Sequence, residues 1–301
     1  MSLRENLMLI GLRMHDQFRN KLEVKTSNFK IHSVFRNVIN LLDDDSHIIS
    51  IVTKNVDRSP YSVIVDADDF SSYIDCIGDT VDAMTNKIYI NETTIDLSTT
   101  NIYKLQRGRF KKNTDTIRKN LFYLDEIIVG IKDTEKSCFA NIANALIMER
   151  IELMKYAYFE GNTDNIIKWG RSLIGLGQGL TPSGDDVLMG IYLVLGLENS
   201  KIPQSDRVLG EIIHGMIGAT TDISYQGLLR SSQGYYRGIL VDTVESICTD
   251  KNISKGLNEV LSIGHSSGYD LILGMRTGFE ILIEKETKNV NKDFNKEKYL
   301  F

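Results

Sequence analysis

The chain has 301 residues, 42% of them hydrophobic and 25% charged, which is ordinary for a globular protein with one large domain or two smaller ones. The formal net charge is −5, and the most basic stretch, residues 104–119, is interpreted as a solvated surface in preference to a functional patch, so we expect no nucleic-acid partner. Three scattered cysteines, the lack of an apolar leader and the lack of a membrane-length apolar run favour a cytoplasmic protein with no membrane partner.

The first half of the chain reads mostly as strands, because it contains short runs rich in β-branched residues bounded by turn residues. The dipeptide Asn91-Glu92 separates two of these runs and indicates a hairpin. The runs predict strands at Ile31–Phe35, Ile48–Thr53, Ser62–Asp66, Lys87–Asn91, Thr93–Leu97 and Leu124–Lys132.

From about residue 140 the apolar residues recur at helical spacing. Strands followed by helices predict an α+β fold, with a mainly β N-terminal domain over residues 1–138 and an all-helical, glycine-rich domain over residues 139–301. The expected helices are Ala140–Phe159, Thr163–Leu173, Ser183–Leu197, Ser205–Ala219, Ser224–Gln233, Ile239–Asp250, Ser254–Ile263 and Gly268–Glu284.

A glycine-rich segment between two of these helices has the most unusual pattern, Gly175-Leu-Gly-Gln-Gly-Leu-Thr-Pro-Ser-Gly-Asp-Asp186. Glycine lets successive backbone N–H groups turn inward, and Thr181 and Ser183 add hydroxyl donors. The start of the following helix offers unpaired N–H groups and partial positive charge. The segment therefore predicts a cradle for a small anion such as phosphate or a carboxylate.

Helix capping is the competing interpretation of this segment. Ser183 and Asp186 have the spacing of a capping box, and Thr181-Pro182 would serve equally well as N-cap and first helical residue. Capping does not account for Asp185 beside Asp186, nor for the run of glycines before the cap. The segment matches neither the Walker A nor the dinucleotide-binding fingerprint, so ATP and NAD are not expected.

The segment also has a second copy. Ser267-Gly-Tyr-Asp-Leu-Ile-Leu-Gly274 repeats Ser183-Gly-Asp-Asp-Val-Leu-Met-Gly190 at a constant offset of 84 residues. Each copy begins a predicted helix, and its last glycine, Gly190 or Gly274, would let that helix approach something closely. The pattern indicates an internal duplication, or two helices that meet at one site. Chance recurrence of a capping pattern is the alternative.

Further polar residues lie at predicted helix starts. His265 precedes the second copy, where an imidazole could meet an anion, and Thr221 and Ser224 have cap spacing at another helix. No metal site is assigned from spacing. Mg²⁺ at Asp185 and Asp186 is the one candidate cofactor, although adjacent side chains on a helix point in different directions.

The chain resembles the AllH family of oxamate carbamoyltransferase subunits over most of its length. The glycine-rich segment is the most specific match, with Gln178 where the family pattern has proline. The resemblance implies a subunit that acts with two partner subunits in anaerobic allantoin or purine breakdown, where oxalurate and phosphate become oxamate and carbamoyl phosphate. Softer matches are His32-Ser-Val-Phe-Arg36, Thr221-Asp-Ile-Ser224 and Gly264-His-Ser-Ser-Gly268.

The motifs and the resemblance together give two groups of candidate site residues. The expected ligands are phosphate, carbamoyl phosphate, oxamate or oxalurate, and the expected macromolecular partners are other protein subunits. A non-catalytic assembly subunit, or an anion-binding protein with another reaction, is the alternative. The candidate catalytic residues are Asp185, Asp186, His265 and Asp270. The candidate substrate-binding residues are Gly177, Gly179, Thr181, Ser183, Gly184, Thr221, Ser224, Ser266, Ser267, Gly268, His32 and Arg36.

Overall fold

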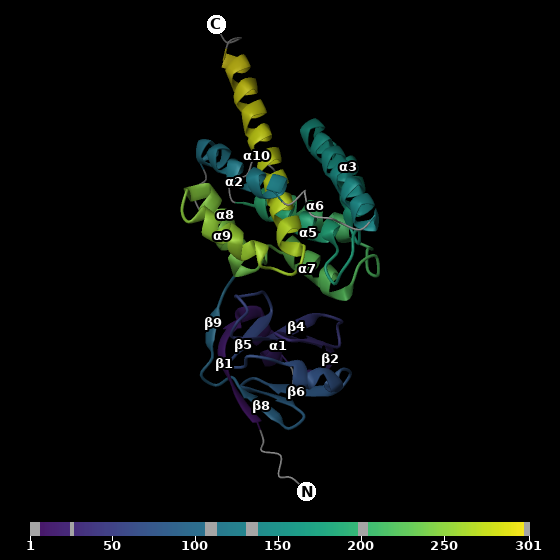
Figure 1. The fold of residues 1–301 in the computed structure, drawn as a ribbon, viewed down its shortest axis with the longest axis vertical. Helices are drawn as coiled ribbons and strands as arrows, with labels where there is room; N and C mark the ends of the chain where they lie inside the picture. Colours follow the sequence, from purple (N-terminus) through teal and green to yellow (C-terminus); the bar gives the residue numbers. More distant parts are fainter. Residues whose placement is uncertain (1–6, 25–26, 106–112, 131–137, 198–203, 298–301) are drawn as a thin grey trace. The chain divides into compact units, whose positions relative to one another are not determined.

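The computed structural model describes residues 7–24, 27–105, 113–130, 138–197 and 204–297, and four basic residues of the 104–119 stretch, at 107, 109, 111 and 112, lie outside them. The chain divides into a unit of strands, residues 1–105, and a unit of helices, residues 106–301 (Figure 1). The expected α+β class is therefore confirmed. Among the described residues, none of the helices has the length and apolar character needed to cross a membrane.

The strand unit is one sheet that closes on itself. The strand order is β5-β4-β3-β2-β6-β7-β8-β1-β9, and a further antiparallel pairing joins β5 to β1. The predicted hairpin is confirmed, because β7 and β8 pair antiparallel around Asn91, which has a φ of 49°. The strands are β1 Leu7–His15, β2 Ser27–Phe35, β3 Val38–Leu42, β4 Ile48–Thr53, β5 Ser62–Val65, β6 Thr80–Met84, β7 Lys87–Ile90, β8 Thr93–Asp96 and β9 Asn101–Tyr103.

Alternate residues of these strands form the core of the first unit, as expected from the two-residue period of a strand. Ile49 and Ile51 of β4, for example, belong to this core and are fully buried. Helix α1, Asp16–Val24, adds Phe18 and Leu22 to the same cluster. A short 3-10 helix, η1 Ser71–Cys76, follows β5.

Within its described residues, the helical unit contains the eight helices expected from the sequence and one more. Helix α4 has the bounds that were predicted, and the others differ by a few residues at their ends, except that α6 is shorter and α10 longer. In Figure 1 the last turns of α10 extend beyond the other helices. The helices are α2 Thr114–Gly130, α3 Cys138–Glu160, α4 Thr163–Leu173, α5 Ser183–Leu195, α6 Ser205–Ile213, α7 Asp222–Ser232, α8 Gly238–Thr249, α9 Ile253–Leu261 and α10 Ser267–Glu297.

Two expectations are wrong. The segment Leu124–Lys132 was expected to be a strand, but its described part belongs to α2. Ile117, Asn120 and Leu124 are buried at helical spacing, and they pack in the helical unit. The division between the units consequently falls at Leu105/Gln106 and not at the expected 138/139 boundary.

Helices α5 and α10 cross in close contact in the helical unit. A Cβ built on Gly190 would lie 2.9 Å from the Cα of Gly274, and one built on Gly274 would lie 2.2 Å from the carbonyl oxygen of Val187. Only glycine permits backbones to approach to this distance. Gly190 and Gly274 were expected to allow a close approach, and the structure shows that they allow α5 and α10 to approach each other.

The predicted duplication extends to the backbone hydrogen bonds. In the first copy the amide of Leu176 donates to Leu173 O (3.0 Å) and that of Gly184 donates to Leu176 O (2.8 Å). In the second copy Ile263 N donates to Val260 O (2.9 Å) and Gly268 N donates to Ile263 O (3.0 Å).

The first backbone hydrogen bonds of α5 and α10 are also equivalent. Asp186 N donates to Pro182 O (3.3 Å), and Asp270 N donates to Ser266 O (3.1 Å). Each copy is thus a helix, a turn and a second helix. The α4–α5 turn is longer than the α9–α10 turn, since seven positions separate Leu176 from Ser183 and four separate Ile263 from Ser267.

Candidate functional site

The α4–α5 turn leaves several backbone amides without a protein acceptor. Gly175, Gly177 and Gly179 all have positive φ, which turns the chain tightly before α5. A Cβ on Gly177 would lie 2.8 Å from the amide nitrogen of Ser183, so the turn packs against the first residue of the helix. Within the described residues, no acceptor bonds the amides of Gly177, Gln178, Gly179, Leu180, Thr181 and Ser183.

Other amides of the segment are already used by the protein. Gly184 N donates to Leu176 O, and Asp185 N donates to Pro182 O at 2.9 Å. Gly184 is therefore required for packing, since a Cβ there would lie 2.0 Å from Leu173 O, but its amide is not available to an anion.

The capping box expected at the start of α5 is not formed. Ser183 is the first helical residue, Pro182 is the N-cap, and no side chain caps the helix. The alternative, with Thr181 as N-cap and Pro182 as the first helical residue, is wrong by one position, because the helix begins at Ser183. Capping therefore does not explain why Thr181, Ser183 and Asp186 occur here.

Asp185 holds three segments of the helical unit together. The side chain is fully buried, and its Oδ1 accepts from Gly175 N at 2.9 Å. Its Oδ2 accepts from the hydroxyl of Thr220 and from Ser224 Oγ, the latter at 2.7 Å. Burial raises the pKa of this carboxyl, against the lowering effect of hydrogen bonds from Thr220, Ser224 and Gly175. We interpret Asp185 as a residue that positions the turn.

Replacing Asp185 with alanine is expected to lower the free energy of unfolding by about 3 kcal/mol, because the buried hydroxyl of Ser224 and the half-buried donors of Gly175 and Thr220 would lose their acceptor. Urea denaturation followed by circular dichroism measures this. Asp164→Ala, on an exposed position in the first turn of α4, is the matched control and should cost about 0.5 kcal/mol or less. Equal losses for both variants would contradict the role of Asp185.

Asp186 belongs to the first copy of the repeated unit and contacts the second copy. Its carboxyl is hydrogen-bonded by the hydroxyls of Ser267 and Thr181, which are themselves 2.8 Å apart. The residue is 2% exposed, and its Oδ2 has no hydrogen-bond partner among the described residues. Desolvation by burial raises the pKa of Asp186 to about 8, and the charge of neighbouring Asp270 adds to this effect. The hydrogen bond from Ser267 acts in the opposite direction and lowers the pKa. This carboxyl therefore holds a proton near neutral pH.

A joint magnesium site at Asp185 and Asp186 is not supported by these contacts. The two side chains reach different partners, Gly175, Thr220 and Ser224 for Asp185, and Thr181 and Ser267 for Asp186.

Helix α7 brings the third predicted segment to the same place. Thr221 is the N-cap and accepts from Ser224 N at 3.1 Å, so the expected cap spacing is confirmed. The Thr221 hydroxyl also donates to Leu180 O, which ties α7 to the glycine-rich turn. Thr220 was not predicted, although it contacts Asp185 directly. Its position beside the Thr221 cap is the only sequence signal that could have indicated it.

The remaining candidates of the helical unit lie at the α9–α10 turn. His265 and Ser266 are exposed, and Ser267 is the first residue of α10. Gly268 is buried against the end of α9, where a Cβ would lie 2.2 Å from Val260 O. Asp270 is 4% exposed.

His32 and Arg36 belong to the strand unit. His32 Nδ1 lies 3.0 Å from Ser33 Oγ, and exposed Arg36 donates from Nε to Asp69 Oδ2 at 3.2 Å. Both side chains therefore have local partners, and their proposed contact with substrate stays a prediction.

A group of three possible metal ligands occurs in the strand unit, where ligand atoms of Asp43, Asp45 and His47 lie within 4.8 Å of one another. The ammonium of Lys21 lies 2.6 Å from Asp43 Oδ2 and 3.4 Å from His47 Nδ1. Because a cation already occupies this position, we assign no metal there.

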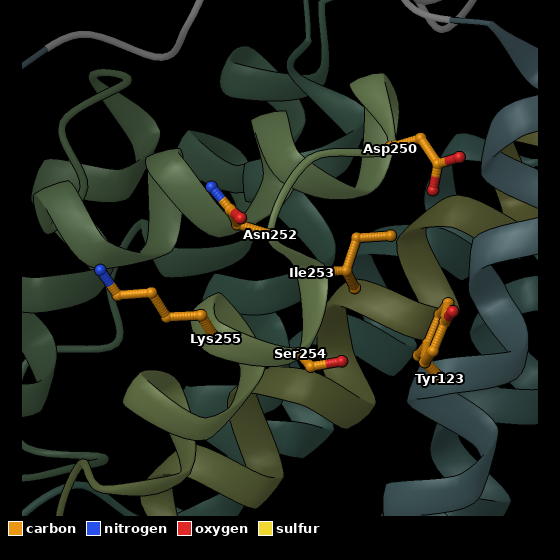
Figure 2. Close-up of a pocket in the computed structure, with 6 residues that line it drawn as sticks. All are labelled: Tyr123, Asp250, Asn252, Ile253, Ser254 and Lys255. Carbon is orange, nitrogen blue, oxygen red and sulfur yellow. The ribbon is translucent and has the colours of Figure 1, made fainter.

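A surface hollow of about 380 Å³ lies elsewhere in the helical unit (Figure 2). In Figure 2, Ile253 and Ser254 lie on the side of Tyr123, whereas Lys255 extends away from it. None of the candidate site residues lines this hollow, so it is not part of the proposed site. Its lining residues are Tyr123, Asp250, Asn252, Ile253, Ser254 and Lys255.

Two family models match the chain. The model described as oxamate carbamoyltransferase subunit AllH matches residues 173–279, which include the glycine-rich turn, α5, α7 and the whole second copy at residues 267–274. The AllH family N-terminal domain matches residues 10–102, which is nearly the whole strand unit. No solved structure matches the chain.

Proposed function

The chain belongs to the AllH family of oxamate carbamoyltransferase subunits, and from this we propose that its helical unit binds a small anionic substrate at the α4–α5 turn. The reaction proposed for the assembled enzyme converts oxalurate and phosphate into oxamate and carbamoyl phosphate. The observation that carries the proposal is the set of turn amides, from Gly177 to Ser183, that bond no protein acceptor. Unused amides at a helix start are suited to phosphate or carboxylate oxygens.

The chemistry of the reaction calls for both kinds of group found here. A phosphate oxygen attacks the carbamoyl carbon of oxalurate, the bond from that carbon to the amide nitrogen breaks, and the departing nitrogen takes up a proton to give oxamate. Amides directed at the anionic oxygens would stabilise the charge that develops during attack. Asp186, which retains its proton near neutral pH, would supply the proton to nitrogen.

The family description also implies partner subunits, since it names a subunit of a larger enzyme. We propose that the chain acts in the cytoplasm as one component of that complex. Asp185 would act through the turn that it positions, whereas Asp186 would touch the substrate.

Isothermal titration of phosphate, oxamate and carbamoyl phosphate tests this proposal on the chain alone and in complex with its partner subunits. Leu180, which is 52% exposed in the turn, offers a site for a repelling charge. Leu180→Asp is expected to weaken phosphate binding about tenfold, equivalent to about 1.4 kcal/mol. Tyr156→Asp, at a 65% exposed position of α3, is the matched control and should leave binding unchanged.

The second candidate function is a non-catalytic assembly subunit, favoured by the close helix crossing at Gly190 and Gly274. Under this function neither the chain nor the complex would bind anions through the turn. Full activity of a complex that carries Leu180→Asp, together with loss of activity when the chain is omitted, would support assembly over substrate binding.

A further inference from the structure

The second turn repeats the feature on which the proposed function rests. Within the described residues, the amides of Gly264, His265, Ser266 and Ser267 donate to no protein acceptor. Gly264 has a φ of 58°, so this turn also reverses through a left-handed glycine. The α9–α10 turn is therefore a shorter version of the α4–α5 turn, with the same free donors at the start of a long helix.

The two turns meet at their hydroxyl groups. Thr181 Oγ1, from the first turn, lies 2.8 Å from Ser267 Oγ, from the second, and both hydroxyls bond the carboxyl of Asp186. The Oδ2 atom of this 2% exposed side chain has no partner among the described residues. A buried carboxyl oxygen without a partner costs free energy unless a ligand completes its hydrogen bonding. This independent observation points to a ligand between the two turns.

We infer that the two turns are two anion subsites on either side of the Asp186 carboxyl, one for the phosphate group and one for the carboxylate of the second substrate. The inference rests on the proposed function, and it adds that both substrates bind this chain at once. A transfer reaction between two anions needs both of them held with their reacting atoms together.

The number of free donors assigns the substrates to the turns. The α4–α5 turn has six free amides and suits phosphate, which presents up to four oxygens, whereas the α9–α10 turn has four and suits the two oxygens of a carboxylate. Exposed His265 occupies the position equivalent to Thr181, 84 residues later, and its imidazole could donate a further hydrogen bond beside the second turn.

The test uses the chain with its partner subunits, and inorganic phosphate and oxamate as probes. Each anion is titrated calorimetrically in the absence of the other and at saturation with it. We expect both to bind together, with the Kd of each changed less than about threefold by the other. Gln178→Glu and His265→Glu place a matching negative charge at an exposed position of each turn.

Gln178→Glu is expected to weaken phosphate about tenfold and oxamate less than about twofold, and His265→Glu should show the reverse selectivity. Mutual exclusion of phosphate and oxamate, or equal weakening of both anions by each variant, would overturn the two-subsite inference and leave the proposed function standing. Absence of binding by either anion would overturn the proposed function and this inference with it.

Discussion

Gly274→Ala is expected to destabilise the helical unit, whereas the same change at Gly210 is expected to stabilise it. The methyl group at Gly274 would lie 2.2 Å from Val187 O and 2.9 Å from the Cα of Gly190, both of which are backbone atoms that cannot rotate away. Helices α5 and α10 would have to separate, at a cost of about 3 kcal/mol. At Gly210, inside α6, the methyl would meet nothing within 4 Å, and alanine should gain about 1 kcal/mol in helix propensity.

Thermal unfolding of the two variants measures the contrast. For a unit of this size each kcal/mol shifts the Tm by roughly 2–4 °C, so Gly274→Ala should melt about 6 °C lower or more and Gly210→Ala slightly higher than wild type. The separation would also break the contact between Thr181 and Ser267, and anion binding should fall with it. A Gly274→Ala chain that melts at or above the wild-type temperature would show that α5 and α10 do not cross at these glycines.

The local patterns that predicted the fold correctly were those in which period and composition agreed. Helix α4 carries helical periodicity and is capped by Asn162, which accepts from Asn165 N at 3.0 Å. Strand β4 is rich in β-branched residues that are buried in the closed sheet. The hairpin around Asn91 has a turn residue that tolerates positive φ.

The segment at Leu124 failed because composition and period disagreed. Its run of β-branched residues favours a strand, but Ile117, Asn120 and Leu124 recur at helical spacing and are buried together. Asn120 also donates to Ile247 O at 2.9 Å, a contact with α8 that the sequence does not reveal. Tertiary packing thus decided the structure of α2. The early end of α6 has a different, local cause. This helix ends at Ile213 because Gly215 and Gly218 adopt positive φ in the turn that follows.

The sequence indicated several residues that the structure brings together at the two turns of the helical unit, but not what each of them contacts. The repeat at a constant offset of 84 indicated that Ser183 and Ser267 are equivalent helix starts, and the structure gives the two starts the same pattern of backbone hydrogen bonds. The two adjacent aspartates could not be told apart from sequence. Asp185 is satisfied by Thr220, 35 residues away, and this contact depends on the folded α6–α7 connection.

Asp186→Asn is expected to stabilise the protein, and increasingly so as the pH rises from 4 to 8. The pKa of Asp186 is about 8 in the folded chain, against an ordinary value of 3.8 for an aspartate in the unfolded chain. Between these values the folded state retains a proton that the unfolded state has lost, so wild-type stability falls with pH by up to about 1.4 kcal/mol per unit. Asparagine is neutral throughout, so it avoids this loss, which reaches at most about 5 kcal/mol at pH 8.

Urea denaturation of wild type and variant at pH 5 and at pH 8 measures the effect. The difference in free energy of unfolding between variant and wild type should be larger at pH 8 than at pH 5 by more than about 2 kcal/mol. Asp164→Asn, at an exposed position of α4, is the control and should show no such change with pH.

A stabilised Asp186→Asn chain should at the same time lose activity in the assembled enzyme, because asparagine cannot give a proton to the departing nitrogen. Buried carboxyls that cost stability are retained where they serve a function, which is the reason to expect opposite changes in stability and activity. The charge of Asp270 adds to the cost at Asp186 and should be better tolerated beside asparagine. A variant that is more stable at pH 8 and fully active would remove Asp186 from the proposed chemistry and leave it a merely unfavourable buried acid.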